Sequence, residues 1–418
     1  MKIVRPICCG MDVHKDLIVA TIATTNENGV TEYIQESFCT QNYDLFRLKN
    51  WLKEHNCSCA CMESTGKYWI PIFNILEDEI ETYIAHPKYT KAIKGKKTDK
   101  KDSKWIADLF KHDLIKFSFI PPKQIRELRE LCRYRYKLVC IRSGEANRYQ
   151  NAMTVSNIGL ASVLSDVFGT TSQKLMNEVL SSDTINEQAL LDLLDGKTKK
   201  KSKEILASFK DSKIEADQHL KMELITNHMT NLNESIEKLE EEILSRCLPL
   251  APSFSQISHI PGISPLSAML IVSEIGVNMD AFESEAALCS WAGLAPANNE
   301  SANKKKSVRI SKAGIYLKPL LVQCALAAIA NKKIPYFRNK YEIIKKRRGH
   351  KKAIIAIARK LLVCVYHMIL TGEDFNPSDL DKVLNPKAYS KKKELTPELA
   401  LEFLASQGYD ISQLSITQ

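Results

Sequence analysis

Gly10-Met11-Asp12-Val13-His14-Lys15-Asp16 is the stretch from which the fold of this chain is best worked out. It ends a strand-like run and places a carboxylate at the end of that run. The segments around it alternate between strand and helix patterns. Strands are predicted at 7–13, 17–24, 30–38, 58–62 and 82–85, and helices at 43–55, 68–79 and 102–112. The order βββαβαβα predicts a mixed α/β sheet with helices on its faces.

Four acidic residues lie at the ends of these segments. Besides Asp12 they are Glu63, in Cys61-Met62-Glu63-Ser64-Thr65-Gly66, and the pair Asp99 and Asp102, in Lys97-Thr98-Asp99-Lys100-Lys101-Asp102. Converged carboxylates repel one another unless a divalent cation such as Mg²⁺ or Mn²⁺ neutralises them. Such a cluster is suited to phosphodiester cleavage. The alternative is that the pair caps a helix and that Glu63 is a surface residue.

Composition limits the class of protein. The 418 residues are 44% hydrophobic and 26% charged, enough for two or three domains with ordinary cores. No apolar run is expected to reach membrane-spanning length, and residues 1–6 do not open a signal peptide. Twelve cysteines without such a signal indicate free thiols in a reducing compartment. We therefore expect a cytoplasmic protein with no membrane partner.

Three cysteines, Cys57, Cys59 and Cys61, follow one another at every second position. This spacing predicts that all three lie on one face of a buried strand. A metal site is the alternative, but no histidine or second cysteine pair nearby completes a zinc site.

Positive charge is concentrated near the C-terminus. Residues 301–360 contain 18 basic residues and one acid, Glu342, so this stretch carries +17 of a chain whose net charge is +10. So strong a local excess favours a polyanion such as nucleic acid as partner. A solvated lysine face that promotes solubility is the alternative.

Residues 121–250 are predicted to be mostly helical. A long helix is expected at 125–153, and a later heptad seam predicts either a helix pair within the chain or a contact between subunits. The heptad seam consists of Ile225, Met229, Leu232, Ile236, Leu239 and Ile243. Separately, the lysine-rich stretch 196–203 is expected to be an exposed loop.

Two C-terminal motifs suggest contacts with nucleic acid. Ile260-Pro261-Gly262-Ile263 opens an apolar helix, as in a helix-hairpin-helix whose turn binds a phosphate, although an ordinary helix–turn–helix corner is the alternative. Farther on, a polar loop carries Ser301 and several basic residues. A serine can attack a phosphodiester if it is activated and if cations hold the phosphate, but most loop serines only satisfy their own backbone. The basic residues expected at phosphates are Lys304, Lys305, Lys306, Arg309, Lys312, Lys345, Lys346, Arg347 and Arg348.

Taken in this order, the motifs resemble a known family over nearly the whole chain. The chain is similar to the DEDD transposases of bacterial insertion sequences, of the insertion-sequence one-hundred-and-ten type, also called bridge-RNA-guided recombinases. G-M-D-V-H-K, E-S-T-G-x-Y and K-T-D-K-x-D resemble its RuvC-like nuclease domain. I-P-G-I, G-L-A-P, N-N-E-S-A and R-I-S-K-A-G resemble its transposase domain.

The resemblance implies a set of roles that the residues alone do not give. Asp12, Glu63, Asp99 and Asp102 would bind Mg²⁺ or Mn²⁺ in an RNase H-like fold, and Ser301 would be the nucleophile that joins cleaved DNA. A non-coding guide RNA would choose donor and target DNA, and a homodimer would assemble to a tetramer, with the active site shared across subunits. Where relatives commonly have glycine shortly after the serine, this chain has Asn303, so Ser307 and Ser311 stay open as substitutes.

The expected organisation follows from these motifs. It comprises a RuvC-like domain at 1–120, a helical coiled-coil region at 121–250, a mainly helical transposase domain with the helix-hairpin-helix at 251–371, and a tail at 372–418. Two other functions stay open: a hydrolytic RuvC-like nuclease that uses activated water, and an inactive nucleic-acid-binding protein. Region 157–220 and the tail have no functional interpretation from sequence.

Overall fold

The computed structural model describes residues 2–64, 66–90, 98–182, 185–296, 299–301, 304–307 and 309–384, with the backbone alone at 88, 89, 299–301 and 304–307. The chain divides into two compact units, Met1–Pro122 and Lys123–Gln418.

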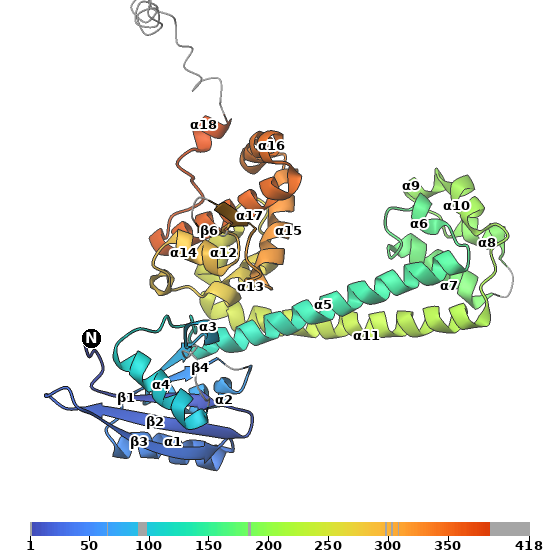
Figure 1. Cartoon of the computed structure of the whole chain (residues 1–418). Helices are drawn as coiled ribbons and strands as arrows, with labels where there is room; N and C mark the ends of the chain where they lie inside the picture. Colours follow the sequence, from blue (N-terminus) through green and yellow to red (C-terminus); the bar gives the residue numbers. More distant parts are fainter. Residues whose placement is uncertain are drawn as a thin grey trace, which may run out of the picture. The chain divides into compact units, whose positions relative to one another are not determined.

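The first unit is built on a five-stranded sheet of order β3-β2-β1-β4-β5 (Figure 1). β1, β2 and β3 are antiparallel, whereas β1, β4 and β5 run parallel. The predicted mixed sheet is therefore confirmed, with β1 at its centre. The strands are β1 (Ile7–Val13), β2 (Leu17–Thr25), β3 (Thr31–Cys39), β4 (Cys59–Glu63) and β5 (Glu81–Ala85).

Helices cover both faces of this sheet. α1 (Asn42–Glu54) and α2 (Trp69–Leu76) bury Leu48 and Leu76 against one face. α4 (Asp99–Lys111) buries Ala107 and Phe110 against the other, and a short helix, α3 (Pro87–Thr90), precedes it. Alternate residues of β1 therefore enter two separate cores, as expected for a strand buried on both faces.

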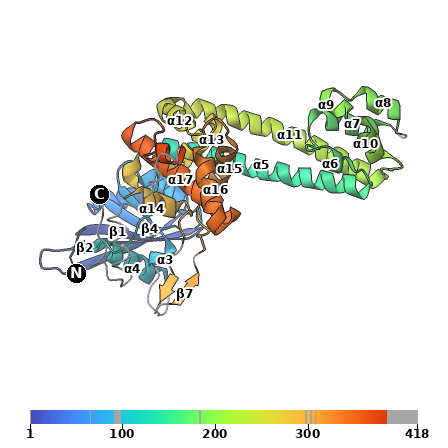
Figure 2. The same ribbon diagram turned by 90° about the horizontal axis from the view of Figure 1, so that it is seen from above.

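In the second unit, two long helices run side by side and antiparallel: α5 (Lys123–Val155) and α11 (Ala216–Cys247) (Figure 2). Leu128 and Cys132 at the start of α5 pack with Ile243 near the end of α11, while Tyr149 packs near Ile225. The predicted heptad seam faces α5, so it is used within the chain.

Helices α6 to α10 gather at one end of this helix pair and share a core with it. The prediction of a loop at 196–203 was wrong. These residues are mostly exposed but helical, because the Thr198 hydroxyl accepts from the backbone nitrogen of Asp195 at 3.0 Å and begins a new helix there. The five helices are α6 (Leu160–Val163), α7 (Thr170–Ser181), α8 (Glu187–Asp192), α9 (Gly196–Lys199) and α10 (Ser202–Phe209).

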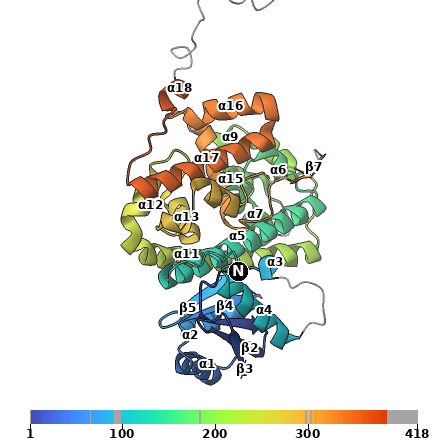
Figure 3. The ribbon, with the colours of Figure 1, turned by 60° about the vertical axis from the view of Figure 1, so that its left-hand side comes forward.

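Farther along the chain, α17 (His350–Thr371) packs against α12 (Ala251–Ser258), α14 (Glu285–Trp291), α15 (Leu317–Ala330) and α16 (Tyr336–Arg348) (Figure 3). Tyr336 and Phe337 of α16 are buried and contact Phe375, which follows α17. The other elements in this part of the unit are η1 (Leu248–Leu250), α13 (Pro265–Ile275), η2 (Met279–Ala281) and α18 (Leu380–Leu384).

The expectation that no apolar run reaches membrane-spanning length was wrong for α17. This 22-residue helix is long and apolar enough to cross a membrane by length and composition. Many of its apolar side chains, among them Ile357, Leu361 and Val365, are buried, whereas Leu370 is exposed. A helix of this composition can therefore also belong to a protein core, where its apolar side chains pack against neighbouring helices.

Candidate metal centre and nucleic-acid surfaces

Asp12 is the penultimate residue of β1 and Glu63 is the last residue of β4, and these two strands are neighbours and parallel. Met11 pairs with Met62, so the next residue on each strand is one of these two acids. Alternate side chains point to opposite faces, and Cys8 and Cys61 contact α4 on one of them. Asp12 lies four residues after Cys8 and Glu63 two after Cys61, so both acids project toward the α4 face.

A glycine allows α4 to cross very close to β1. A Cβ atom built on Gly10 would lie 2.2 Å from the backbone nitrogen of Ala107 and 2.4 Å from the backbone oxygen of Ser103. Only a residue without a side chain fits at this crossing. Because Gly10 lies between Cys8 and Asp12 on the same face, the crossing brings the first turn of α4 toward Asp12.

Hydrogen bonds to the antiparallel strands fix α4 in this place. The hydroxyl groups of Thr21 and Ser103 are 2.7 Å apart and fully buried. The side-chain nitrogen of Gln35 donates both to Thr21 at 2.8 Å and to the carbonyl of Lys100 at 2.7 Å. Gly10 pairs with Thr21, and Thr21 pairs with Gln35, so these three residues lie side by side on adjacent strands. Together they fix the position of α4 against the sheet.

The first turn of α4 carries the other two predicted acids. Thr98 caps the helix by accepting from the backbone nitrogen of Lys101, and Asp99 and Asp102 follow. Asp99 Oδ1 lies 3.5 Å from His14 Nε2, which is itself 3.2 Å from Asp12 Oδ2. Asp12, His14 and Asp99 thus form a cluster in which one potential ligand atom from each lies within 4.8 Å of the others.

The environment of Asp12 disfavours its charged form. Its side chain is only 14% exposed, and burial raises its pKa. The charges of Asp99 and Asp102 raise that pKa further, while His14 opposes them. A divalent cation would relieve this repulsion, and an oxygen-rich donor set suits Mg²⁺ or Mn²⁺. The side chains at this site are therefore suited to bind the Mg²⁺ or Mn²⁺ ion that the sequence led us to expect.

Glu63 is linked to α4 through a short helix. Its Oε2 accepts a hydrogen bond from the Thr90 hydroxyl at 2.7 Å, and the Trp105 indole donates to the Thr90 carbonyl at 3.1 Å. The helix that carries Asp99 and Asp102 therefore also orients the partner of Glu63.

The cysteines near this site are buried thiols. The prediction that three of them share one strand face was wrong for Cys57, because β4 begins only at Cys59 and Cys57 packs in the opposite core. Cys59 and Cys61 contact α4. Burial raises the pKa of Cys57 to about 12 and that of Cys59 to about 11, so neither is a ready thiolate ligand.

Ser301 lies on a small hairpin of the second unit. It ends β6 (Asn299–Ser301), which pairs antiparallel with β7 (Lys304–Ser307), and Ser301 is opposite Lys304. The side chains of Ser301, Lys304, Lys305, Lys306 and Ser307 lie outside the described part of the structure. The backbone therefore places the serine on the strand next to the lysines, without giving the direction of its hydroxyl.

The base of this hairpin is closed by direct backbone contact. A Cβ on Gly293 would lie 2.4 Å from the carbonyl oxygen of Ala313, and one on Gly314 would lie 2.1 Å from that of Ala292. Both glycines have positive φ angles, of 70° and 67°. Pro296 and Ile310 form a bridge just beyond them.

The other residues predicted to contact phosphate are exposed. Arg309 and Lys312 follow the hairpin, and Ser311 accepts from the backbone nitrogen of Ala313 at 3.3 Å, as a loop serine commonly does. Four consecutive cations occupy the last turn of α16, the end of a helix where positive charge is favourable. They are Lys345, Lys346, Arg347 and Arg348.

The proline-glycine turn joins α12 to α13 and packs inside the unit. Gly262 has a φ of +92°, and a Cβ there would lie 2.4 Å from the backbone nitrogen of Ala328 in α15. Ser264 caps α13 by accepting from the backbone nitrogen of Ser267. The glycine is thus required by helix packing, and a contact of this turn with phosphate stays a prediction.

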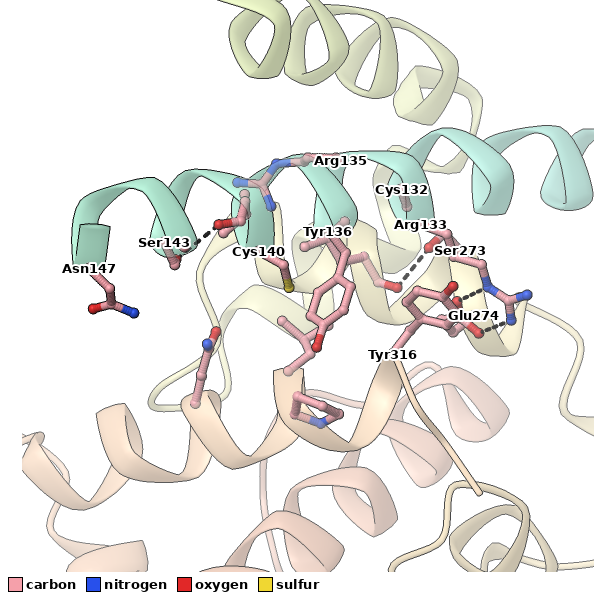
Figure 4. Close-up of a pocket in the computed structure, with 16 residues that line it drawn as sticks. Cys132, Arg133, Arg135, Tyr136, Cys140, Ser143, Asn147, Ser273, Glu274 and Tyr316 are labelled. Atoms are coloured by element: carbon pink, nitrogen blue, oxygen red, sulfur yellow. Dashed lines mark hydrogen bonds and ion pairs between the residues drawn. The ribbon is translucent and has the colours of Figure 1, made fainter. Parts of the chain in front are cut away.

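A cavity of about 460 Å³ opens between α5, α13 and α15 (Figure 4). Arg133 forms a bidentate ion pair with the buried Glu274 at its edge, at 2.7 and 2.8 Å. The Tyr316 ring stacks under the Arg133 guanidinium, 4.7 Å away, and meets Tyr136 edge-on. None of the residues that line this cavity is one of the predicted site residues.

Sequence reasoning missed several residues that build the metal centre. His14 lies within the first motif but was assigned no role there, and its position two residues after Asp12 was the available signal. Thr90 carried no signal, because only the fold brings it to Glu63. Gly10 could be recognised as a close approach only once the crossing helix was known.

Two family models match the chain. The first, described as a transposase of the DEDD and IS110 type, matches residues 9–157, which include most of β1 and the whole of α4 and α5. The second, described as transposase IS116/IS110/IS902 family, matches residues 255–342, from α12 into α16. No curated protein matches the chain significantly. Both the acidic cluster and the serine hairpin lie within the matched residues, and these two matches support a transposase of an insertion sequence.

Proposed function

We propose that this transposase cuts, exchanges and rejoins DNA strands with a divalent-metal centre on Asp12, Glu63, Asp99 and Asp102 and with Ser301 as nucleophile. The observation that carries the proposal is the crossing of α4 at Gly10. It brings two acids of a helix to the same sheet face as the acids at the ends of β1 and β4.

Each group of residues would have its own role in the reaction. The four carboxylates would hold Mg²⁺ or Mn²⁺, which when bound would orient the scissile phosphate and stabilise its developing charge. The Ser301 oxygen would attack phosphorus and release a 3′ or 5′ hydroxyl, and the serine ester would keep the bond energy for rejoining. The neighbouring cations would hold the phosphates on either side: Lys304, Lys305, Lys306, Arg309 and Lys312.

The proposal extends to partners and assembly. A guide RNA from the element would select donor and target DNA, and a homodimer would assemble to a tetramer in which the acidic centre and the serine act across subunits. The exposed cations that end α16 support contact with a polyanion. Free thiols throughout the described chain are in keeping with a reducing, cytoplasmic setting.

The test uses full-length protein with the RNA that copurifies with it and a nicked DNA substrate. After quenching, digestion and mass spectrometry should locate a DNA adduct on the peptide that contains Ser301. Ser301→Ala should remove the adduct and retain DNA binding, whereas Asp12→Asn should abolish strand cleavage and recombination. An adduct on Ser307 or Ser311 would refute the serine assignment.

A second outcome would change the reaction class. Cleavage that requires Asp12 but yields free ends, with no protein adduct, would favour the hydrolytic nuclease. Recombination by a variant that lacks the carboxylates of both Asp12 and Glu63 would refute the metal centre itself.

A further inference from the structure

His14 is placed at the acidic centre by the end of β1. It follows Val13, the last residue of β1, and its side chain contacts Asp12 and Asp99. Its backbone nitrogen donates to the Leu17 carbonyl at 2.9 Å across the β1–β2 turn. This bond fixes the turn, and with it the direction in which the imidazole leaves the backbone.

The ring lies between two carboxylates from different elements. Nε2 is 3.2 Å from Asp12 Oδ2 on β1 and 3.5 Å from Asp99 Oδ1 on α4. The His14 side chain is 49% exposed, so its position is not explained by packing in a hydrophobic core. Its nitrogen is directed at the place where the carboxylates converge.

The spacing of these atoms matches that of neighbouring ligands of one ion. Two ligands at right angles, each about 2.1 Å from an octahedral ion, are about 3 Å apart. The distances from Nε2 to the two carboxylate oxygens are close to this value, and all three atoms lie within 4.8 Å of one another. A small adjustment of the side chains would let one ion contact all three.

We propose that His14 is itself a ligand of the metal centre, through Nε2, and that the resulting nitrogen and oxygen donor set makes the centre bind Mn²⁺ in preference to Mg²⁺. Imidazole is a good ligand for transition metals, whereas Mg²⁺ favours carboxylate and water oxygens. This inference rests on the proposed function, because it concerns the same metal centre.

The direct test is pulsed electron paramagnetic resonance of the full-length protein with one equivalent of Mn²⁺. A coordinated imidazole gives modulation from its ¹⁴N nucleus, and this modulation should change when the histidines are labelled with ¹⁵N. His14→Ala and His14→Gln should both lose it. His55→Ala is the matched control, because that ring bonds the Trp51 carbonyl in α1 on the other face of the sheet, and it should keep the signal.

Affinity gives an independent measurement. Loss of an outer partner of a metal ligand commonly weakens metal affinity about 10- to 100-fold, so loss of a ligand should cost at least about tenfold for Mn²⁺. Mg²⁺ affinity should fall less, and the ratio of the two affinities should therefore decrease. His14→Gln keeps a hydrogen-bonding side chain. If His14 only positioned the carboxylates, this variant would retain the wild-type ratio.

The outcomes separate this inference from the proposed function. Mn²⁺ that binds in an Asp12-dependent manner without ¹⁴N modulation would overturn the role of His14 and leave the acidic centre standing. Mn²⁺ that does not bind the wild-type protein at all would overturn both. Modulation that disappears in the two His14 variants and persists in His55→Ala would establish the ligand.

Discussion

Replacing Gly10 by alanine tests whether the close crossing of α4 over β1 positions the acidic centre. The added Cβ would lie 2.2 Å from the backbone nitrogen of Ala107 and 2.4 Å from the backbone oxygen of Ser103. Ordinary contacts begin near 3.5 Å, so the helix must move away from the strand by about 1 Å. Both clashing atoms belong to the backbone of a helix, so no side chain can rotate to make room.

Two effects should follow from this movement. Overpacking of this kind costs about 1–3 kcal/mol, so the urea midpoint for unfolding should fall. Asp99 and Asp102 move with α4, and a misplacement of about 1 Å can lower activity about 100-fold. We expect weaker Mn²⁺ binding and slower strand cleavage, measured by titration and by single-turnover assays.

Gly144→Ala is the matched control. A Cβ at Gly144, in the middle of α5, would meet only the end of the Arg148 side chain at 3.6 Å. Alanine in a helix interior is more stable than glycine by about 0.5–1 kcal/mol, so this variant should be as stable as the wild type or more so. If Gly10→Ala unfolds at the wild-type urea concentration and binds Mn²⁺ with wild-type affinity, the crossing does not position the acids.

Three further outcomes are expected. Changing the four cations that end α16 to glutamine should reduce the slope of log K against log salt for DNA binding by about 0.9 per lost phosphate contact, whereas the same change at Lys197, Lys199, Lys200 and Lys203 should leave it unaltered. Glu274→Gln should lower the free energy of unfolding by about 3 kcal/mol in urea titrations, because it leaves Arg129 and Arg133 without their buried counter-charge; a loss below about 1 kcal/mol would show that solvent already screens the pair. Because burial and the nearby acids raise the pKa of Asp12, its contribution to stability is complete below the ordinary carboxyl pKa and is lost as pH rises through the raised value. Asp12→Asn should therefore stabilise the metal-free protein at pH 7 in EDTA but not at pH 3, and equal urea midpoints at pH 7 would contradict the repulsion argument.

Local patterns predicted most of the first unit. The strands β1 to β5 begin and end within one or two residues of their expected positions, because alternation and turn residues are local signals. Composition was misleading at 196–203, where a run of lysines suggested a loop. Lysine is a good helix former, and the capping box of Asp195 and Thr198 was not recognised.

The centre was predictable only in part. Asp12 and Glu63 could be placed at strand ends, but the pairing of β1 with β4 that makes them neighbours depends on contacts far apart in sequence. The same holds for Thr90 and Trp105, whose link to Glu63 exists only after α3 and α4 have packed. His14 was within reach of local reasoning, since its spacing from Asp12 was visible in the first motif.

The closed base of the serine hairpin has a consequence for how this protein can change. Ala292 and Gly293 touch Ala313 and Gly314 through their backbones, so the chain leaves the helical unit and returns to it at nearly one point. The entropy cost of holding the two ends of a flexible loop together grows only slowly with loop length, by about 0.6 kcal/mol for each doubling. The hairpin can therefore be lengthened, shortened or exchanged with little effect on the helices that carry it. The sequence of the serine hairpin can therefore change by mutation without a large change in the stability of the helices on which it stands.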